Sequence, residues 1–471
     1  MNTDPTSASA VPRALGAFRG IRGVSGSVGA LVLAFALLVR GGVLLTPAAL
    51  RADPDGYRAI ALNLLEQGTL GHGEIPTAYR PPLYPLLLVP PLALGPLGRA
   101  AVGLLHLVLG LATVWLTYQL ALRWGLGRRA APAAALLVAC DPLLVAGSAL
   151  VMTETLAALL ALTSLACLSG ASERPTPWRL ATTGACLALA ILCRPTFLPW
   201  TLAAALLLPW LAACKGGAAP VRAAARALAW FAAPVALVLA PWAIRNQVQF
   251  GRPIVTTTHG GYTLLLGNNL HFYDHLRSAP WGTIWLADKL QEDLAALTPS
   301  RRTAADEIAA EVTADQTAYR LAWQTIRDQP ATFACACAVR VGRLWSPLPH
   351  QVSPQEGAVM RWLRYLVGLW YVVELPVALL GAIALWRGNY GKAPIQSVEW
   401  ISGLPRRAFP GRATALGRFG AFWSLLLAAS FTGVHILYWT DMRMRTPMMP
   451  AIAIAAAAGM AWVVGRVLGR K

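Results

Sequence analysis

Charged residues are scarce in this sequence. Only 13% of its 471 residues are Asp, Glu, Lys or Arg, whereas about a quarter is usual for a soluble globular chain. Hydrophobic residues make up 56%, and the mean hydropathy is +0.52. The shortage of charge excludes a series of soluble domains. Together with the excess of hydrophobic residues, it predicts an all-α polytopic membrane protein.

Recognisable cysteine patterns and internal repeats are missing as well. The seven cysteines form neither a disulfide framework nor a zinc-binding spacing, and the C-x-C at Cys335 and Cys337 matches no redox motif. The other five lie in or beside apolar runs, where cysteine usually behaves as a small hydrophobic residue. No sequence repeat is evident, so the inverted-repeat signature of many transporters is absent.

Long apolar runs follow one another along the chain. A transmembrane helix needs about 20 mostly apolar residues to cross a hydrocarbon core of about 30 Å. The stretches 131–170 and 178–213 each suffice for two crossings and are expected to form helical hairpins. In all we expect about ten spans: 26–50, 101–122, 131–148, 153–170, 178–194, 197–213, 228–243, 361–385, 419–438 and 447–464.

Basic residues are distributed unevenly between the segments that join these spans. If the N-terminus is cytoplasmic, the inside segments hold 20 of the 40 Lys and Arg but only three acidic residues, which is +17 of the net charge of +19. The positive-inside rule therefore places both chain ends in the cytoplasm. It also explains the basic composition without nucleic acid. The inside segments are 1–25, 123–130, 171–179, 214–227, 386–418 and 465–471.

The spans and loops divide the chain into four parts. Three arginines before the first span indicate an uncleaved signal anchor. The long outer segment begins with strand-like residues at 254–258, continues as a helical stretch from about 286 to 329, and is expected to form a small helical lobe. The parts are a cytoplasmic tail (1–25), a transmembrane module (26–243) with the first outer loop (51–100), the outer segment (244–360), and C-terminal transmembrane helices (361–471) around a cytoplasmic loop (386–418).

The first outer loop combines a turn, a short helix and a proline-rich segment. Asp53-Pro54-Asp55-Gly56 predicts a turn with an acidic residue at a helix N-cap. From Tyr57 the apolar residues recur at helical spacing, which predicts an amphipathic helix at the membrane surface. The segment 80–85 is expected to be extended and rigid. One interpretation gives Asp53 only a capping role and Arg80 only a contact with lipid headgroups.

Further ionisable residues lie at the outer ends of the predicted spans. Each costs about 2.5–3.5 kcal/mol to insert at membrane depth, so such residues are usually functional. A carboxylate can deprotonate a nucleophile, and arginine pairs bidentately with a phosphate. The pattern therefore predicts a site for transfer from a phosphate-bearing donor, although Arg194 and Arg245 could also anchor helices at headgroups. The residues are Glu154, Arg194, Arg245, Arg443 and Arg445.

The order of these motifs resembles the GT-C fold glycosyltransferases of the family 39 type, the bacterial relatives of protein O-mannosyltransferases and of lipid A aminoarabinose transferases. Asp53-x-x-x-Tyr57 is similar to the Asp-Glu-x-x-Tyr motif of that family, but Pro54 replaces the Glu. The resemblance extends from about residue 30 to 465. The other similar segments are Arg80-Pro81-Pro82-Leu83-Tyr84-Pro85, Thr153-Glu154, Arg194-Pro195-Thr196, Arg245-Asn246, Gly267-Asn268-Asn269 and Arg443-x-Arg445-x-Pro447.

The resemblance implies a function and a set of site residues. A sugar would pass from a polyprenyl-phosphate donor to a cell-envelope acceptor, with inversion, at the periplasmic face of a bacterial inner membrane. Asp53 would be the general base and Glu154 would support it. No metal ligand is assigned. The missing second acid argues against a metal requirement, but Asp55 could stand in for that acid, so a divalent metal stays possible. Arg80, Arg443 and Arg445 would neutralise the donor phosphate, and the substrate-binding residues would be Asp55, Tyr57, Tyr84, Arg194, Arg245 and Asn268.

Alternatives to this interpretation remain open at the level of the sequence. A transporter or flippase for a lipid-linked or anionic substrate would also need many helices and membrane charges, but it would place the charges at the midplane on broken helices. A polymerase or ligase that uses a lipid-diphosphate donor would share the enzyme class.

Three other polar motifs were weighed for function. His271 and His275, with Asp274, could form a metal-binding face on a helix, although polar loop residues fit equally. Asp141-Pro142 is expected to be a helix end at the membrane interface. Glu374 lies within the eighth span, where it could pair with another helix.

Overall fold

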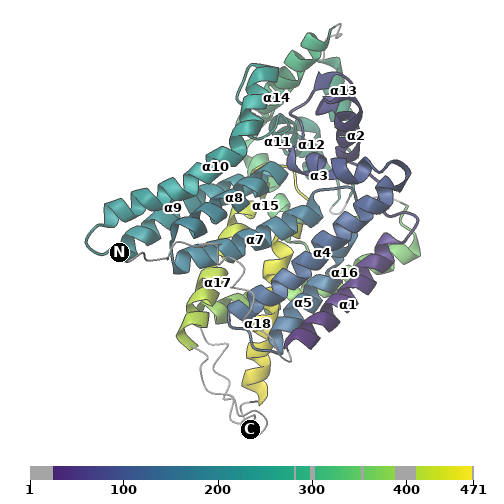
Figure 1. Ribbon diagram of the computed structural model, residues 1–471. Helices are drawn as coiled ribbons and strands as arrows, with labels where there is room; N and C mark the ends of the chain where they lie inside the picture. Colours follow the sequence, from purple (N-terminus) through teal and green to yellow (C-terminus); the bar gives the residue numbers. More distant parts are fainter. Residues whose placement is uncertain (1–24, 281–282, 298–302, 352–354, 388–409, 469–471) are drawn as a thin grey trace, which may run out of the picture.

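The structure, a computed structural model, describes residues 25–280, 283–297, 303–351, 355–387 and 410–468. Within these ranges it is almost entirely helical (Figure 1). The predicted cytoplasmic tail 1–25, apart from its last residue, and most of the predicted loop 386–418 lie outside the described residues. The polytopic all-α class is confirmed, because most of the long helices are apolar enough to span a membrane.

Every predicted span is helical in the structure. Eight described helices have the length and composition of a membrane span, and a bent pair makes a ninth. The remaining one, α8, is apolar but has only 17 residues. The span helices are α1 (Ser25–Leu44), α4 (Gly98–Arg123), α5 (Ala130–Cys140) with α6 (Pro142–Ser148), α7 (Glu154–Glu173), α8 (Pro177–Cys193), α9 (Leu198–Lys215), α10 (Pro220–Phe250), α16 (Ala358–Arg387), α17 (Pro410–Leu437) and α18 (Met449–Leu468).

Most of the remaining elements gather at one end of the span helices, at the top of Figure 1, and the last helix of the outer segment lies nearer the middle of the view. In the first outer loop these are α2 (Tyr57–Gln67), the antiparallel pair β1 (Gly71–His72) and β2 (Ile75–Pro76), and α3 (Leu83–Leu92). The outer segment contributes α11 (Gly260–Gly267), α12 (Leu270–Ser278), α13 (Asp288–Ala296), α14 (Ala304–Asp328) and α15 (Pro330–Trp345). Short 3-10 turns precede three spans: η2 (Gly95–Leu97), η3 (Pro195–Phe197) and η4 (Met442–Met448).

Three local predictions were wrong. Residues 254–258 form no strand, although the Thr258 amide donates to the carbonyl oxygen of Ala78. The segment 80–85 is not extended to its end, because α3 begins at Leu83. A proline in the first turn of a helix removes an N–H group that has no partner there, so Pro85 is compatible with α3. Finally, α17 begins at Pro410, so it occupies part of the predicted loop 386–418.

The third span is broken at Asp141, where α5 and α6 meet at an angle of 49°. The Asp141 side chain caps α6 by accepting a hydrogen bond from the Leu144 amide at 2.8 Å, and it also accepts one from the Tyr371 hydroxyl. A break in a helix leaves carbonyl groups without partners. Arg40 of α1 donates to two of them, the carbonyl oxygens of Val138 and Leu144. The helix end predicted at Asp141 is therefore confirmed. The Asp141 residue is 1% exposed.

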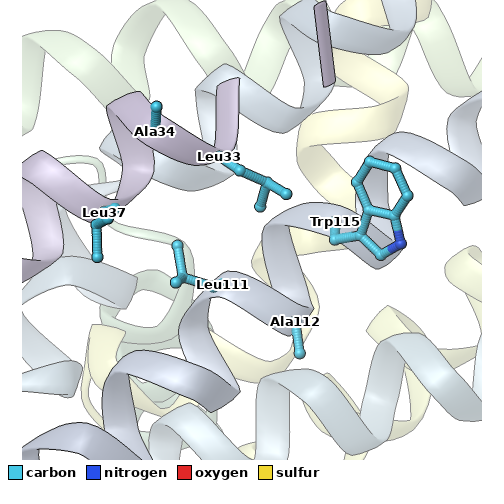
Figure 2. A pocket seen from close by; sticks show the side chains of 6 residues that line it. All are labelled: Leu33, Ala34, Leu37, Leu111, Ala112 and Trp115. Carbon is cyan, nitrogen blue, oxygen red and sulfur yellow. The ribbon is translucent and has the colours of Figure 1, made fainter. Parts of the chain in front are cut away.

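Small residues and apolar surface shape the rest of the bundle. A Cβ atom added to Gly381 of α16 would lie 1.7 Å from the carbonyl oxygen of Ala455, and one on Gly459 of α18 would lie 2.1 Å from that of Val377. These two helices therefore cross at backbone contact, as small residues permit in membranes. Between α1 and α4 lies a hollow of about 360 Å³ lined only by hydrophobic side chains (Figure 2): Leu33, Ala34, Leu37, Leu111, Ala112 and Trp115.

Candidate active site

The first outer loop is joined to the start of α7 by backbone hydrogen bonds. The Leu50 amide donates to the carbonyl oxygen of Ala149 at 2.7 Å, and the Val151 amide donates to that of Ala52 at 3.3 Å. Leu50 has a φ of +57°, a value that is costly for a residue other than glycine. Arg58 stabilises this turn by donating to the Leu50 carbonyl oxygen. The pairing places Asp53, one residue after Ala52, next to the segment that leads into Glu154.

The two carboxylate oxygens of Asp53 have different surroundings. Oδ2 accepts hydrogen bonds from the amides of Arg58 (3.0 Å) and Ala59 (3.3 Å), which are free N–H groups in the first turn of α2. Oδ1 is buried and has no hydrogen-bond partner among the described residues. The capping interpretation is thus correct for one oxygen, and the other oxygen remains available as a proton acceptor.

Glu154 is fully buried and pairs with two arginines from distant parts of the chain. Its Oε1 lies 3.0 Å from Nη2 of Arg194, which follows α8, and 3.5 Å from Nε of Arg443 in η4. Arg194 also donates from Nε to the Thr153 hydroxyl at 2.7 Å. A buried carboxylate requires such partners. The structure therefore brings together three residues that the sequence predicted for one site, although they span nearly 300 positions.

Arg80 lies beside Asp55 and two tyrosines of the first outer loop. Its Nη2 lies 3.0 Å from a carboxylate oxygen of Asp55, and its Nε donates to the Asp55 carbonyl oxygen at 3.0 Å. The guanidinium group also lies near the rings of Tyr57 and Tyr79, at 5.7 and 5.2 Å from their centroids. These two hydrogen bonds leave three of its five N–H donors for a ligand. Asp55 thus orients the arginine that was predicted to bind phosphate.

Aromatic hydroxyl groups line the region between Asp53 and Glu154. Burial raises the pKa of Tyr84 above its usual range, and the charges of Glu154 and Asp53 raise it further. Burial also raises the pKa of Tyr57 and brings that of Tyr79 to about 12. All three phenols therefore keep their protons at neutral pH, and the Tyr84 hydroxyl forms a hydrogen bond with His106. His259, which packs edge-on against Tyr79, stays neutral because burial and then Arg80 lower its pKa to about 3.

Two polar side chains that the sequence did not single out support this region. His106 of α4 bonds to the Ser148 carbonyl oxygen through Nδ1 (2.9 Å), so its Nε2 is the acceptor for the Tyr84 hydroxyl at 2.8 Å. Glu311 of α14 accepts hydrogen bonds from the first outer loop. Neither lies in a distinctive motif, and each is recognisable only from its partners in space.

The remaining predicted site residues bind the protein itself. Arg245 donates to the carbonyl oxygens of Thr77 and Leu70, both at 2.9 Å. Arg445 is fully buried, where it donates to the carbonyl oxygens at the end of α15 and stacks 4.3 Å from the Tyr371 ring. Asn268 is fully buried and bonded to α11, to Tyr273 and to the Leu437 carbonyl oxygen. None of these hydrogen bonds involves Asp53 or Glu154.

Three further candidate residues also have local roles. Glu374 accepts a hydrogen bond from Trp370 on its own helix, and its other oxygen is buried without a hydrogen-bond partner among the described residues. His271 pairs with Asp293, and Asp274 pairs with Arg277. In the part of the chain that the structure describes, no three His, Cys, Asp or Glu side chains are grouped as metal ligands would be.

Residues 79–244 match the family described as dolichyl-phosphate-mannose-protein mannosyltransferase. The match covers about a third of the chain and includes Arg80, Glu154 and Arg194, whereas Asp53 and Arg443 lie outside it. It confirms the expected resemblance and the expected enzyme class, a membrane glycosyltransferase. No curated protein sequence matches this chain.

Several solved structures are distantly similar. The protein O-mannosyltransferase complex Pmt1-Pmt2 of S. cerevisiae, bound to the sugar donor, shares 18% identity over 50% of this chain and 35% of that chain, with a TM-score of 0.40. ArnT from Cupriavidus metallidurans, bound to undecaprenyl phosphate, shares 16% over 88% and 78%, with a TM-score of 0.44. Arabinosyltransferase EmbB from Mycobacterium smegmatis shares 14% over 94% and 44%, with a TM-score of 0.35. At these values no residue role or substrate is transferred to this chain.

Proposed function

We propose that this membrane glycosyltransferase moves a sugar from a polyprenyl-phosphate donor to a cell-envelope acceptor, with inversion, at the periplasmic face of a bacterial inner membrane. The observation that carries the proposal is the free Oδ1 of Asp53 in a region where Arg80 pairs with Asp55 and where Arg194 and Arg443 approach Glu154. The description of the matching family, which names a dolichyl-phosphate sugar, supports a donor of the polyprenyl-phosphate class.

The proposed reaction is a single displacement. Asp53 Oδ1 removes the proton from an acceptor hydroxyl group, and that oxygen attacks the anomeric carbon of the donor sugar. The bond between this carbon and the phosphate oxygen breaks as the new bond forms, so the configuration inverts. The electron pair leaves with the phosphate, and arginine stabilises the negative charge that develops there.

Arg80 and Arg443 are the arginines best placed to receive the leaving phosphate. Arg443 is 34% exposed, and only one of its nitrogens approaches Glu154. Arg80 keeps three N–H donors free. Arg194 pairs with Glu154 Oε1 and with the Thr153 hydroxyl, so it holds the start of α7 in place, while Glu154 Oε2 is buried without a hydrogen-bond partner among the described residues. Arg445 and Asn268, given direct substrate roles from the sequence, act through the protein in this proposal.

The prenyl chain of the donor needs an apolar groove. A hollow of about 270 Å³ opens between α16, α17 and α18, and its wall includes Met448, three residues after Arg445 in η4. Apart from Ser424, its lining side chains are hydrophobic. We propose that the isoprenoid units nearest the phosphate enter this hollow, because it lies directly beyond the segment that carries Arg443.

Asp53→Asn tests the assignment of the base. The amide oxygen of asparagine still caps α2, so the fold is kept, but the proton acceptor is lost. Sugar transfer in membranes supplied with a polyprenyl-phosphate sugar should fall by about 10²- to 10⁴-fold. Asp274→Asn, a change at an exposed carboxylate, is the matched control and should keep full transfer. Full transfer by Asp53→Asn at an equal protein level would overturn the proposal.

The broken third span is a further feature that a transporter would share. Transporters bind their cargo with charged groups at broken helices. Here both oxygens of Asp141 are occupied by Leu144 and Tyr371. The break therefore leaves no carboxylate oxygen for a cargo, and the enzyme remains the better supported function.

A further inference from the structure

Residues 70–78 of the first outer loop are held from two sides by charged side chains of distant elements. From α10, Arg245 donates to the carbonyl oxygens of Leu70 and Thr77. From α14, Glu311 accepts from the Ala78 amide at 2.9 Å and from the Thr77 hydroxyl at 2.7 Å. The strands β1 and β2 lie between these contacts. We call the two charged side chains and residues 70–78 the clamp.

The hydrogen-bond partners of Glu311 are an amide and two hydroxyl groups. Besides its bonds to the loop, it accepts a hydrogen bond from the Thr258 hydroxyl, and the Thr258 amide donates to the Ala78 carbonyl oxygen. No described Lys, Arg or His lies within ion-pair distance of Glu311. A partly buried carboxylate whose partners are hydroxyl and amide donors fixes backbone position, since each such bond is directional.

The clamp ends two residues before Arg80. Tyr79, the residue in between, packs against His259 at a centroid distance of 4.3 Å and lies under the Arg80 guanidinium group. Any shift of the backbone at 77–78 therefore moves Arg80 relative to Tyr57 and Asp55. This connects α14, which contributes no residue to the proposed chemistry, with the arginine that faces the donor phosphate.

We propose that Glu311 is a positioning residue for the sugar donor, which sets the place of the Arg80 guanidinium group by fixing the backbone at Thr77 and Ala78. The inference rests on the proposed function, because it assigns Arg80 to the donor phosphate. It adds that donor affinity depends on a carboxylate in the outer segment, a part of the chain outside the matched residues 79–244.

The first measurement is donor kinetics. Glu311→Ala should raise the KM for the donor about tenfold with little change in kcat, because ground-state placement of the donor is affected. Glu311→Gln retains an acceptor for the Ala78 amide and should stay within about threefold of the wild type. Glu307→Ala, one helical turn earlier on α14 and without a side-chain hydrogen bond among the described residues, is the matched control and should behave as the wild type. Equal losses for the alanine and glutamine variants at Glu311 would contradict the backbone role.

The second measurement is coupling to Arg80. In an Arg80→Ala background, Glu311→Ala should change the donor KM by less than about twofold, because residues that act through one another are not additive. The same tenfold effect in both backgrounds would overturn the proposal. Where Glu311→Ala does not fold, Thr77→Ala removes one bond of the clamp and takes its place in the cycle.

Hydrogen exchange separates this inference from the proposed function. Exchange of the Ala78 amide should accelerate in Glu311→Ala and not in Glu307→Ala, whatever reaction the protein catalyses. A wild type that transfers no sugar from the polyprenyl-phosphate donor would refute the proposed function, while faster exchange would still support the clamp. Unchanged exchange at 77–80 would refute the clamp itself.

Discussion

Glu154 depends on its two arginines unequally. Arg194 is 12% exposed and makes hydrogen bonds to Glu154 and to Thr153, whereas Arg443 is 34% exposed and approaches Glu154 without a hydrogen bond. Removing one partner of a buried ion pair leaves an uncompensated charge, but removing a more exposed partner costs little. Changes at Arg194 should therefore affect mainly the stability of the protein, and changes at Arg443 mainly the proposed transfer reaction.

We expect Arg194→Met to lower the free energy of unfolding by about 3 kcal/mol, because Glu154 loses its hydrogen-bonded partner. Arg443→Met should cost less than about 1 kcal/mol and should affect transfer instead. Thermal unfolding of the purified protein in detergent measures the first, and transfer assays the second. The double change Arg194→Met with Glu154→Gln should recover part of the lost stability, and a failure to recover any would contradict the ion-pair explanation.

At the residue scale, sequence patterns predicted part of the site. Glu154, Arg194 and Arg443 were recognisable because a charge at the end of an apolar run is costly and rarely accidental. Arg445 follows the same pattern but is occupied by the carbonyl oxygens of α15, which only the packing reveals. Glu311 could not be found, because it lies in a plain alanine-rich helix and its partners in the first outer loop are more than 200 residues away.

The close crossing of α16 and α18 depends on the absence of a Cβ atom at Gly381 and Gly459. Its two glycines let the backbones touch, so the side chain of any larger residue would push the helices apart. This crossing also supports the wall of the 270 Å³ hollow, since Leu379, Ala382 and Ala455 line it. The glycine contact and the proposed prenyl site are thus parts of one arrangement.

Gly381→Leu should destabilise the protein by about 3 kcal/mol, the upper range for overpacking. Gly433→Ala on α17 is the control, because a Cβ atom there meets nothing within 4 Å. Urea or thermal unfolding followed by circular dichroism would measure both. If Gly381→Leu unfolded at the wild-type temperature, the close contact between the two helices would be refuted.

At the element scale, the spans were predictable because length and hydropathy alone decide them. The exceptions have local causes. The break at Asp141 needs a cap and an arginine from α1, and α3 starts inside a proline-rich segment. The strand expected at 254–258 did not form. Its β-branched residues instead contact the first outer loop and Trp242, so tertiary contacts overrode the propensity.

The span helices of the whole molecule are oriented consistently relative to the candidate site. Along the chain, helices that end at the site alternate with helices that begin there, as expected if each span crosses the membrane once. Two exposed native cysteines lie at opposite ends of this arrangement: Cys335 is on α15 beside the outer elements, and Cys214 is on α9 next to the link to α10.

A membrane-impermeant maleimide should therefore label Cys335 in intact cells and Cys214 only after permeabilisation. Cys193, which is buried, should react only in denaturant and serves as the control. Labelling can be followed by mass spectrometry of the two peptides. The opposite pattern would reverse the proposed orientation and place the site in the cytoplasm.

The clamp has a consequence for the order of events during synthesis. Thr77 and Glu311 are separated by 234 positions, and Arg443 contacts Met152 across 291. At about 5–20 residues per second, the first outer loop is made roughly 10 to 50 s before the carboxylate that holds it. During this interval the loop lacks the Glu311 side of the clamp, although Asp55 and Arg80 have both been made. Arg443 is made later still, so under the proposed function transfer cannot begin until η4 has been inserted beside Met152.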